Sequence, residues 1–234
     1  MKKIIALLLA LIMVLSFAAC SKDEPVSDNS ASENSRGEAS SSENQSKEEP
    51  EEQLDHIRGS VDGLVYTNSA AEITFTAPEG WVFLSDDEIA VLYNLSSEEL
   101  LSEETAEILE NTDIVYDMYC QNLTTGASVN INFENLGILY GTILDEKSYL
   151  ELSKNSLGSS ISGSGMELTS CEIVTATVNG KEVSCLDIII NMTDYDIDLY
   201  EKIFVKKVGS FMSCITIGAL TTEEIDEIAA GLSF

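Results

Sequence analysis

Apolar and polar residues alternate along much of the chain, and this period of two is typical of β-strands that bury one face. The pattern predicts strands over Leu64–Tyr66, Glu72–Thr76, Asp113–Gln121, Ser128–Phe133, Cys171–Val178, Lys181–Asn191, Asp198–Val208 and Phe211–Gly218. Asn179-Gly180 favours the positive φ angles of a type I′ turn, and Gly209-Ser210 separates the last two strands. The last third of the chain is therefore predicted to form two consecutive hairpins.

Helix signals lie between the groups of strands. Ser85 and Glu88 have the spacing of a capping box, in which two side chains bond the free amides of a first helical turn. The pattern predicts further helices opened by Ser96–Glu99 (with Leu101, Thr105 and Ile108 at helical spacing), over Asp145–Leu157 up to the Gly/Ser run 158–165, and from Thr221 to about Leu232. Groups of strands interrupted by helices favour an α+β fold: an antiparallel β-sheet flanked by helices, as an α/β/α sandwich, in one domain over residues 61–234.

Two short runs accompany this order of elements, Tyr66-Thr67-Asn68 at the first strand and Ala77-Pro78-Glu79-Gly80-Trp81 after the second. Together they resemble the Mog1/PsbP-like fold and uncharacterised lipid-anchored proteins of gut Firmicutes. The resemblance implies the sandwich architecture. Because the family includes both a Ran-binding nuclear factor and a photosystem subunit, it implies no particular activity.

The first twenty residues predict export. Lys2 and Lys3 precede Ile4–Phe17, an apolar run that suits a signal peptide and is too short for a comfortable membrane span. The run Phe17-Ala18-Ala19-Cys20 resembles the lipobox of bacterial lipoproteins, which implies cleavage after residue 19 and acylation of Cys20. We therefore expect residues 1–19 to be a lipoprotein signal peptide and Cys20 to hold the protein in a lipid bilayer on the extracytoplasmic side. The alternative is an ordinary secretory signal with an incidental cysteine.

Residues 20–60 are rich in Ser, Glu and Asn and almost free of aliphatic side chains. Such a composition cannot bury enough apolar surface to offset the entropy of ordering, so this acidic segment is predicted to be a disordered tether. An acidic arm that binds a partner is the alternative.

Charge and composition exclude several functions. The chain carries a formal net charge of −29, which would repel the phosphates of nucleic acid. Its one histidine, His56, and its last arginine, Arg58, both lie in the predicted tether, so the domain lacks a Ser-His-Asp or Cys-His arrangement and an imidazole zinc ligand. We expect no enzyme activity and no cofactor.

Two features of the domain invite a ligand-binding interpretation. Asp194, Asp196 and Asp198 have the one-in-two oxygen spacing of calcium loops, but Leu199 stands where an EF-hand needs glycine. The alternative is an acidic turn between two strands. Trp81, the single tryptophan, is a candidate to line a ligand pocket, or else an anchor in the core.

The four cysteines after Cys20 are predicted to lie in strands. With a two-residue turn at Asn179-Gly180, Cys185 opposes Val174 and Cys171 opposes Ile188, so these two thiols point to opposite faces and cannot bond. A bridge between Cys120 and Cys214 stays open. The same register places Glu172 opposite Asp187, which is an unfavourable pair of like charges.

These observations favour a membrane-tethered extracytoplasmic lipoprotein domain that acts as a protein-binding or assembly module, with an unidentified protein partner. Two alternatives remain. One is a receptor domain for a solute or for calcium. The other is a hydrolase, which needs two carboxylates about 5–10 Å apart.

Overall fold

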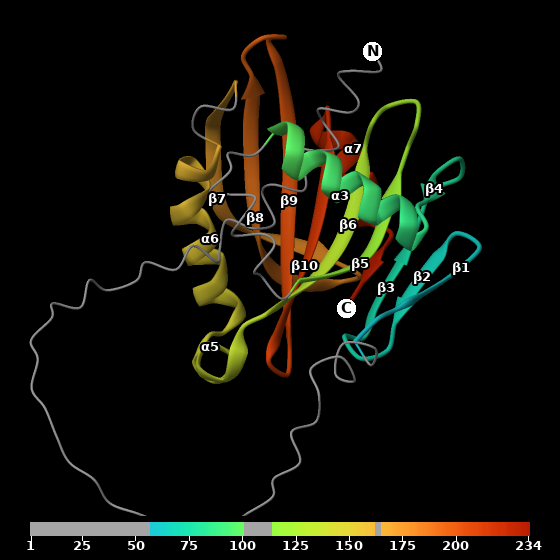
Figure 1. Cartoon of the computed structure of the whole chain (residues 1–234), viewed down its shortest axis with the longest axis vertical. Helices are drawn as coiled ribbons and strands as arrows, with labels where there is room; N and C mark the ends of the chain where they lie inside the picture. Colours follow the sequence, from blue (N-terminus) through green and yellow to red (C-terminus); the bar gives the residue numbers. More distant parts are fainter. Residues whose placement is uncertain (1–56, 101–113, 162–164) are drawn as a thin grey trace, which may run out of the picture.

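A seven-stranded antiparallel sheet, the main sheet, forms the centre of the domain (Figure 1). The computed structural model describes residues 57–100, 114–161 and 165–234 of the chain. In spatial order the strands are β4 (Val82–Phe83), β5 (Ile114–Gln121), β6 (Ser128–Asn135), β10 (Phe211–Ala219), β9 (Ile197–Val208), β8 (Lys181–Met192) and β7 (Met166–Val178). The central strands β6 and β10 are buried on both faces, because other elements cover each side of the sheet.

One face of the main sheet, called here the α6 face, is covered by helices. They are α3 (Asp86–Leu100), α5 (Gly137–Ile143) and α6 (Glu146–Ser160). Leu150 and Leu157 of α6 pack with Ile188 and Leu199, while Ile89 of α3 packs on Tyr119.

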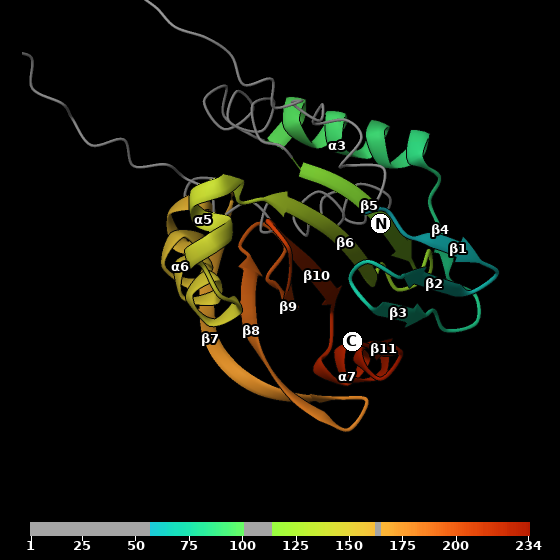
Figure 2. The ribbon, with the colours of Figure 1, turned by 90° about the horizontal axis from the view of Figure 1, so that it is seen from below.

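The opposite face, the α7 face, is covered by helix α7 (Thr222–Ala229) and by a small sheet (Figure 2). The small sheet has the order β1 (Ser60–Asp62), β2 (Val65–Asn68), β3 (Ile73–Thr76) and β11 (Leu232–Ser233). Its Phe75 joins Ile225, Ile228 and Ile215 in the largest apolar core. The α+β class with an antiparallel sheet and helices is therefore confirmed. Among the described helices, none is both long and apolar enough to cross a membrane.

Both predicted hairpins are confirmed. β7 and β8 pair with Val174 opposite Cys185 and Cys171 opposite Ile188, and their turn has φ of 47° at Asn179 and 76° at Gly180. β9 and β10 pair across Gly209-Ser210. The capping box is present too, since the Glu88 carboxylate accepts from the Ser85 amide at 2.8 Å and from its hydroxyl at 2.7 Å.

Two helix predictions need correction. Helix α3 continues through Ser96–Glu99 without a break, because no glycine or proline interrupts residues 86–100. The rest of the helix expected there, with Leu101, Thr105 and Ile108, lies outside the described residues. The last helix ends at Ala229 rather than near Leu232, since Leu232 pairs with Phe75 as β11. Helix α5 was not expected at all.

Residues 57–60, expected to belong to the tether, pack on the described domain. Ile57 is buried, and the Gly59 amide donates to both carboxylate oxygens of Asp117 at 2.9 and 3.0 Å. Arg58 belongs to the fold as well and forms an ion pair with Asp86 at 3.0 Å, so the domain does contain an arginine. Residues 1–56, with Cys20 and His56, lie outside the described residues.

The register that places Glu172 opposite Asp187 is confirmed, and one lysine offsets the pair of like charges. Glu172 accepts from Lys154 of α6 at 2.7 Å, whereas Lys202, which stands opposite Asp187 on β9, donates to Asp226 at 2.7 Å. The predicted repulsion is therefore reduced by a helix residue that the hairpin pattern alone does not contain.

Candidate functional site

Strand β6 carries polar side chains on the α6 face although it lies in the middle of the main sheet. Ser128, Asn130 and Asn132 alternate with Val129, Ile131 and Phe133, which face the α7 core. The neighbouring strand β5 adds Tyr119 to the same face, and β9, which lies beyond β10, adds Glu201. We call these five residues the polar cluster: Tyr119, Ser128, Asn130, Asn132 and Glu201.

The polar cluster is almost completely shielded from solvent. Glu201 is 1% exposed and the other four residues 0%. No hydrogen-bond partner is present for the Tyr119 and Ser128 hydroxyls, for either amide atom of Asn130 and Asn132, or for either carboxylate oxygen of Glu201. Nearly all buried polar groups in proteins are hydrogen-bonded, and each one that is not costs about 1–3 kcal/mol. Such a concentration on one face is what distinguishes this site.

Strand register fixes the layout of the cluster. Ser128 and Glu201 both stand opposite Gly218 of β10, so a glycine separates them in one row across the sheet. Two strand spacings put their backbones about 10 Å apart. Asn130 lies in the next row beside Tyr119, and Asn132 one row further, about 13 Å from Ser128 along β6.

Neither carboxylate oxygen of Glu201 bonds a described cation. Of the described lysines on the strands, Lys207 alone shares the face by register, and its ammonium donates to the Leu144 carbonyl at 2.7 Å. Burial raises the pKa of Glu201 well above its ordinary value, so the side chain favours the neutral acid. Burial also raises the pKa of Tyr119; the Ser128 hydroxyl opposes this, although the two hydroxyls are not in hydrogen-bond geometry.

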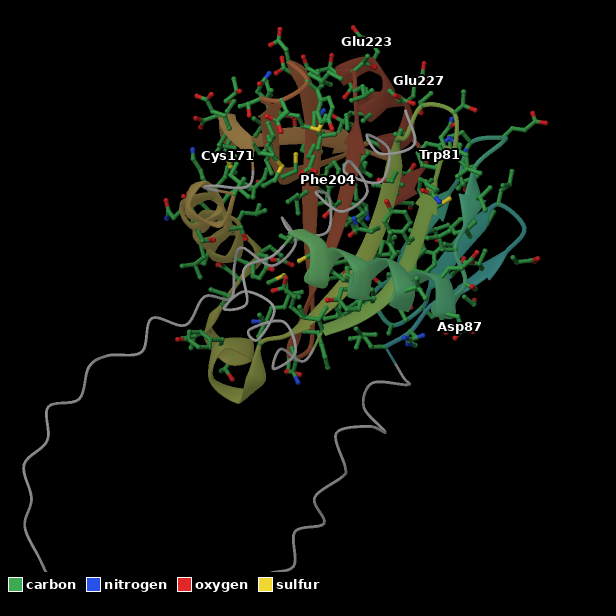
Figure 3. All side chains as sticks on the ribbon, turned by 45° about the horizontal axis from the view of Figure 1, so that its top comes forward. Trp81, Asp87, Cys171, Phe204, Glu223 and Glu227 are labelled. Atoms are coloured by element: carbon green, nitrogen blue, oxygen red, sulfur yellow. The ribbon has the colours of Figure 1, made fainter. Side chains whose placement is uncertain are left out.

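Helix α3 lies over the β5 side of the cluster (Figure 1). Ile89 packs on Tyr119, and Tyr93 stacks on Tyr116 with ring centroids 3.5 Å apart. Its first-turn residue Asp87 points away from the sheet (Figure 3). The described part of α3 is thus held to the sheet by a few apolar and aromatic side chains.

The aspartates proposed for calcium lie elsewhere, at the exposed turn between β8 and β9. Asp196 has φ of 53°, and Asp198 accepts from the Asn191 amide at 2.8 Å. The described ranges contain no group of three His, Cys, Asp or Glu residues arranged to hold a metal, and Asp194 joins no such group. The structure therefore matches the acidic-turn interpretation.

Trp81 packs in the core of the α7 face (Figure 3). Its ring meets Phe75 of the small sheet edge-on, with centroids 6.5 Å apart, and it is 7% exposed. It therefore serves as a core anchor and is not brought near the polar cluster.

The described cysteines are all free. Cys120 and Cys185 lie in the core of the α7 face, while Cys171 and Cys214 lie in that of the α6 face. The bridge between Cys120 and Cys214, left open by the sequence, is therefore ruled out, because the sheet separates the two thiols. Cys214 instead lies 3.2 Å from the Tyr149 hydroxyl.

The buried thiols should be inert in the folded protein. Burial raises the pKa of Cys120 to about 12 and that of Cys171 and Cys185 to about 11, which suppresses the reactive thiolate. In a Cys20→Ser variant, a thiol reagent at pH 8 should label none of the four within minutes and all four in urea. Mass spectrometry checks this; a protein mass that rises on reduction would contradict it.

The two buried carboxylates of the described residues do not form a hydrolytic pair. Glu134 stands opposite Met212 and Glu201 opposite Gly218, so six residues of β10 separate them, or about 20 Å. Glycoside hydrolases need about 5–10 Å between their carboxyl groups.

The polar cluster is not among the candidates from the sequence, because an alternating strand is ordinarily half exposed. One signal could have found it. Ser128–Asn135 carries three asparagine or glutamate side chains at every second position, yet its neighbour Phe211–Ala219 is almost wholly apolar, as expected for a central strand. A polar face on a central strand is unusual and marks a candidate site.

No protein-family model matches this chain, and a comparison with curated proteins likewise finds no match.

Proposed function

We propose that this protein is a lipid-anchored extracytoplasmic receptor domain that binds a polar solute at the polar cluster. The proposal is supported by the buried hydroxyl, amide and carboxyl groups on β5, β6 and β9 that have no hydrogen-bond partner. Anchoring through Cys20 follows from the lipobox-like run at residues 17–20. The Mog1/PsbP-like fold is part of this proposal, and an antiparallel sheet between helical layers supports it.

A purely structural role does not explain the cluster. Apolar side chains of similar size at Asn130 and Asn132 would remove the free-energy cost of burying amides that have no hydrogen-bond partner. Residues that lower stability in this way are typical of sites selected for binding. A polar solute, by contrast, would supply the missing donors and acceptors.

Matched leucine variants test this interpretation. Asn132→Leu should raise the free energy of unfolding by about 1–2 kcal/mol, because it removes two bare amide atoms from the core. Asn68→Leu is the control: Asn68 is equally buried, but its amide donates to Ile57 and Asp117 and accepts from Ala71. That variant should lose about 2–3 kcal/mol. Urea denaturation measures both, and a destabilised Asn132→Leu would contradict the proposal.

A thermal-melt screen identifies the solute class. The full-length chain in detergent is melted with a panel of sugars, amino acids, peptides and amines. A solute at 100 times its dissociation constant should add about 2.7 kcal/mol to stability, and Asn132→Leu should abolish the shift. If no polar solute raises the melting temperature, the receptor proposal is overturned.

The protein-binding role expected from the sequence is a second candidate, favoured by one observation. Val61, Leu64 and Val65 of the β1–β2 hairpin are 47%, 39% and 36% exposed at the free edge of the small sheet. Polar replacements at these positions, followed by cross-linking on intact cells, test it separately from the polar cluster.

A further inference from the structure

The extent of the polar cluster indicates the size of its ligand. Ser128 and Asn132 lie about 13 Å apart along β6, and Glu201 lies two strands away from Ser128. A single ion bound by one end of the cluster would leave the other end bare. An elongated organic molecule of about 10 Å reaches both ends.

The two asparagines suit a repeating amide. Each presents an unpartnered donor and an unpartnered acceptor. They are two residues apart on one strand, a spacing of about 6.8 Å, and an extended peptide repeats its backbone amides with the same spacing. A peptide lying along β6 would therefore meet Asn130 and Asn132 with equivalent groups.

The other end of the cluster suits an amine. Glu201 and Ser128 flank Gly218, whose lack of a side chain removes one obstacle between them. Two described lysines near this face are held by other groups, because Lys154 of α6 donates to Glu172 and Lys207 donates to the Leu144 carbonyl, each at 2.7 Å. An ammonium group there would donate charge-assisted hydrogen bonds to the Glu201 carboxylate and the Ser128 hydroxyl, whereas a carboxylate would be repelled.

We propose that the ligand is a short extended peptide, bound along β6 with its free amino group between Glu201 and Ser128 and its backbone amides on Asn130 and Asn132. This inference rests on the proposed function. It names the solute class and fixes the direction of the chain, with the amino terminus at the Glu201 end.

Calorimetric titration of the full-length chain in detergent tests the inference with three probes. They are trialanine amide, N-acetyl-trialanine amide and maltotriose, a neutral molecule of similar length. Trialanine amide should bind, and acetylation should weaken binding by at least about tenfold, because it removes the charge that meets Glu201. In Glu201→Gln the difference between the two peptides should shrink to about twofold or less.

The outcomes separate the two proposals. Equal binding of both peptides to the unaltered chain, or an unchanged preference in Glu201→Gln, would overturn the amino-terminal capture. Binding of maltotriose without either peptide would overturn the peptide inference and leave a polar-solute receptor. Binding of none of the three would overturn the peptide inference, and the broader thermal-melt screen would then decide the receptor role.

Discussion

Replacing Asp117 with alanine should lower the free energy of unfolding by about 4 kcal/mol, because it leaves three part-buried or buried donors without an acceptor. The Asp117 carboxylate accepts from the Gly59 amide, from the Tyr66 hydroxyl and from the Asn68 amide at 3.0 Å. These bonds join the first residues of the fold to β5. Urea unfolding followed by Trp81 fluorescence measures the loss, since Trp81 is the only tryptophan and is buried.

Two controls separate this network from a general charge effect. Asp226→Ala removes a carboxylate that is 70% exposed and paired with Lys202, so it should change stability by no more than about 0.5 kcal/mol. Tyr66→Phe removes one hydroxyl and keeps the ring, so it should cost about 1 kcal/mol. Should Asp117→Ala lose no more than Asp226→Ala, Asp117 would not hold the N-terminal segment.

The last third of the chain could be predicted because its signals are local. Asn179-Gly180 sets the turn, and the turn sets the register of every pair in the β7–β8 hairpin, including Glu172 opposite Asp187. The capping box at Ser85 is likewise contained in four consecutive residues. In each case the energy that selects the structure comes from neighbours in sequence.

Elements fixed by distant contacts could not be predicted. A bulge in β5 between Tyr116 and Met118 puts Asp117 outside the regular alternation, and Asp117 is the acceptor for the segment at Gly59. Strand β11 forms because Leu232 pairs with Phe75, far away in the sequence. The alternation of apolar and polar residues predicts neither the bulge in β5 nor the pairing of β11.

The polar cluster belongs to the same class. Alternation correctly places Asn130 and Asn132 on one face of β6. Whether that face meets water depends on what packs over it, and the alternation along one strand carries no information about that. Burial of the face is therefore a tertiary property. The candidates from the sequence, Trp81 and the aspartates Asp194, Asp196 and Asp198, rest on residue type and spacing, which do not report burial.

Glu201→Gln should make the protein more stable, by an amount that grows with pH. Burial raises the pKa of Glu201 above its ordinary value of 4.5, so above pH 4.5 the unfolded chain releases a proton that the folded chain retains. The contribution of Glu201 to stability then falls by about 1.4 kcal/mol per pH unit until the folded pKa of Glu201 is reached. Below pH 4.5 the carboxyl is neutral in both states and the two proteins should unfold alike. At pH 6 the variant should therefore unfold at a higher urea concentration than the unaltered protein.

Glu227→Gln removes the same charge from an exposed position on α7, so it serves as the control and should not reproduce this pH-dependent gain (Figure 3). Equal unfolding of Glu201→Gln and the unaltered protein at pH 6 would mean that the carboxylate is already compensated in the fold. The predicted gain, together with lost discrimination between free and acetylated peptide, would show that one group lowers stability and supports binding. A carboxylate retained for the core would give the opposite pattern. Its removal would destabilise the fold, and the discrimination between free and acetylated peptide would not change. Measuring stability and binding in the same variant therefore distinguishes a group retained for a ligand from one retained for the core.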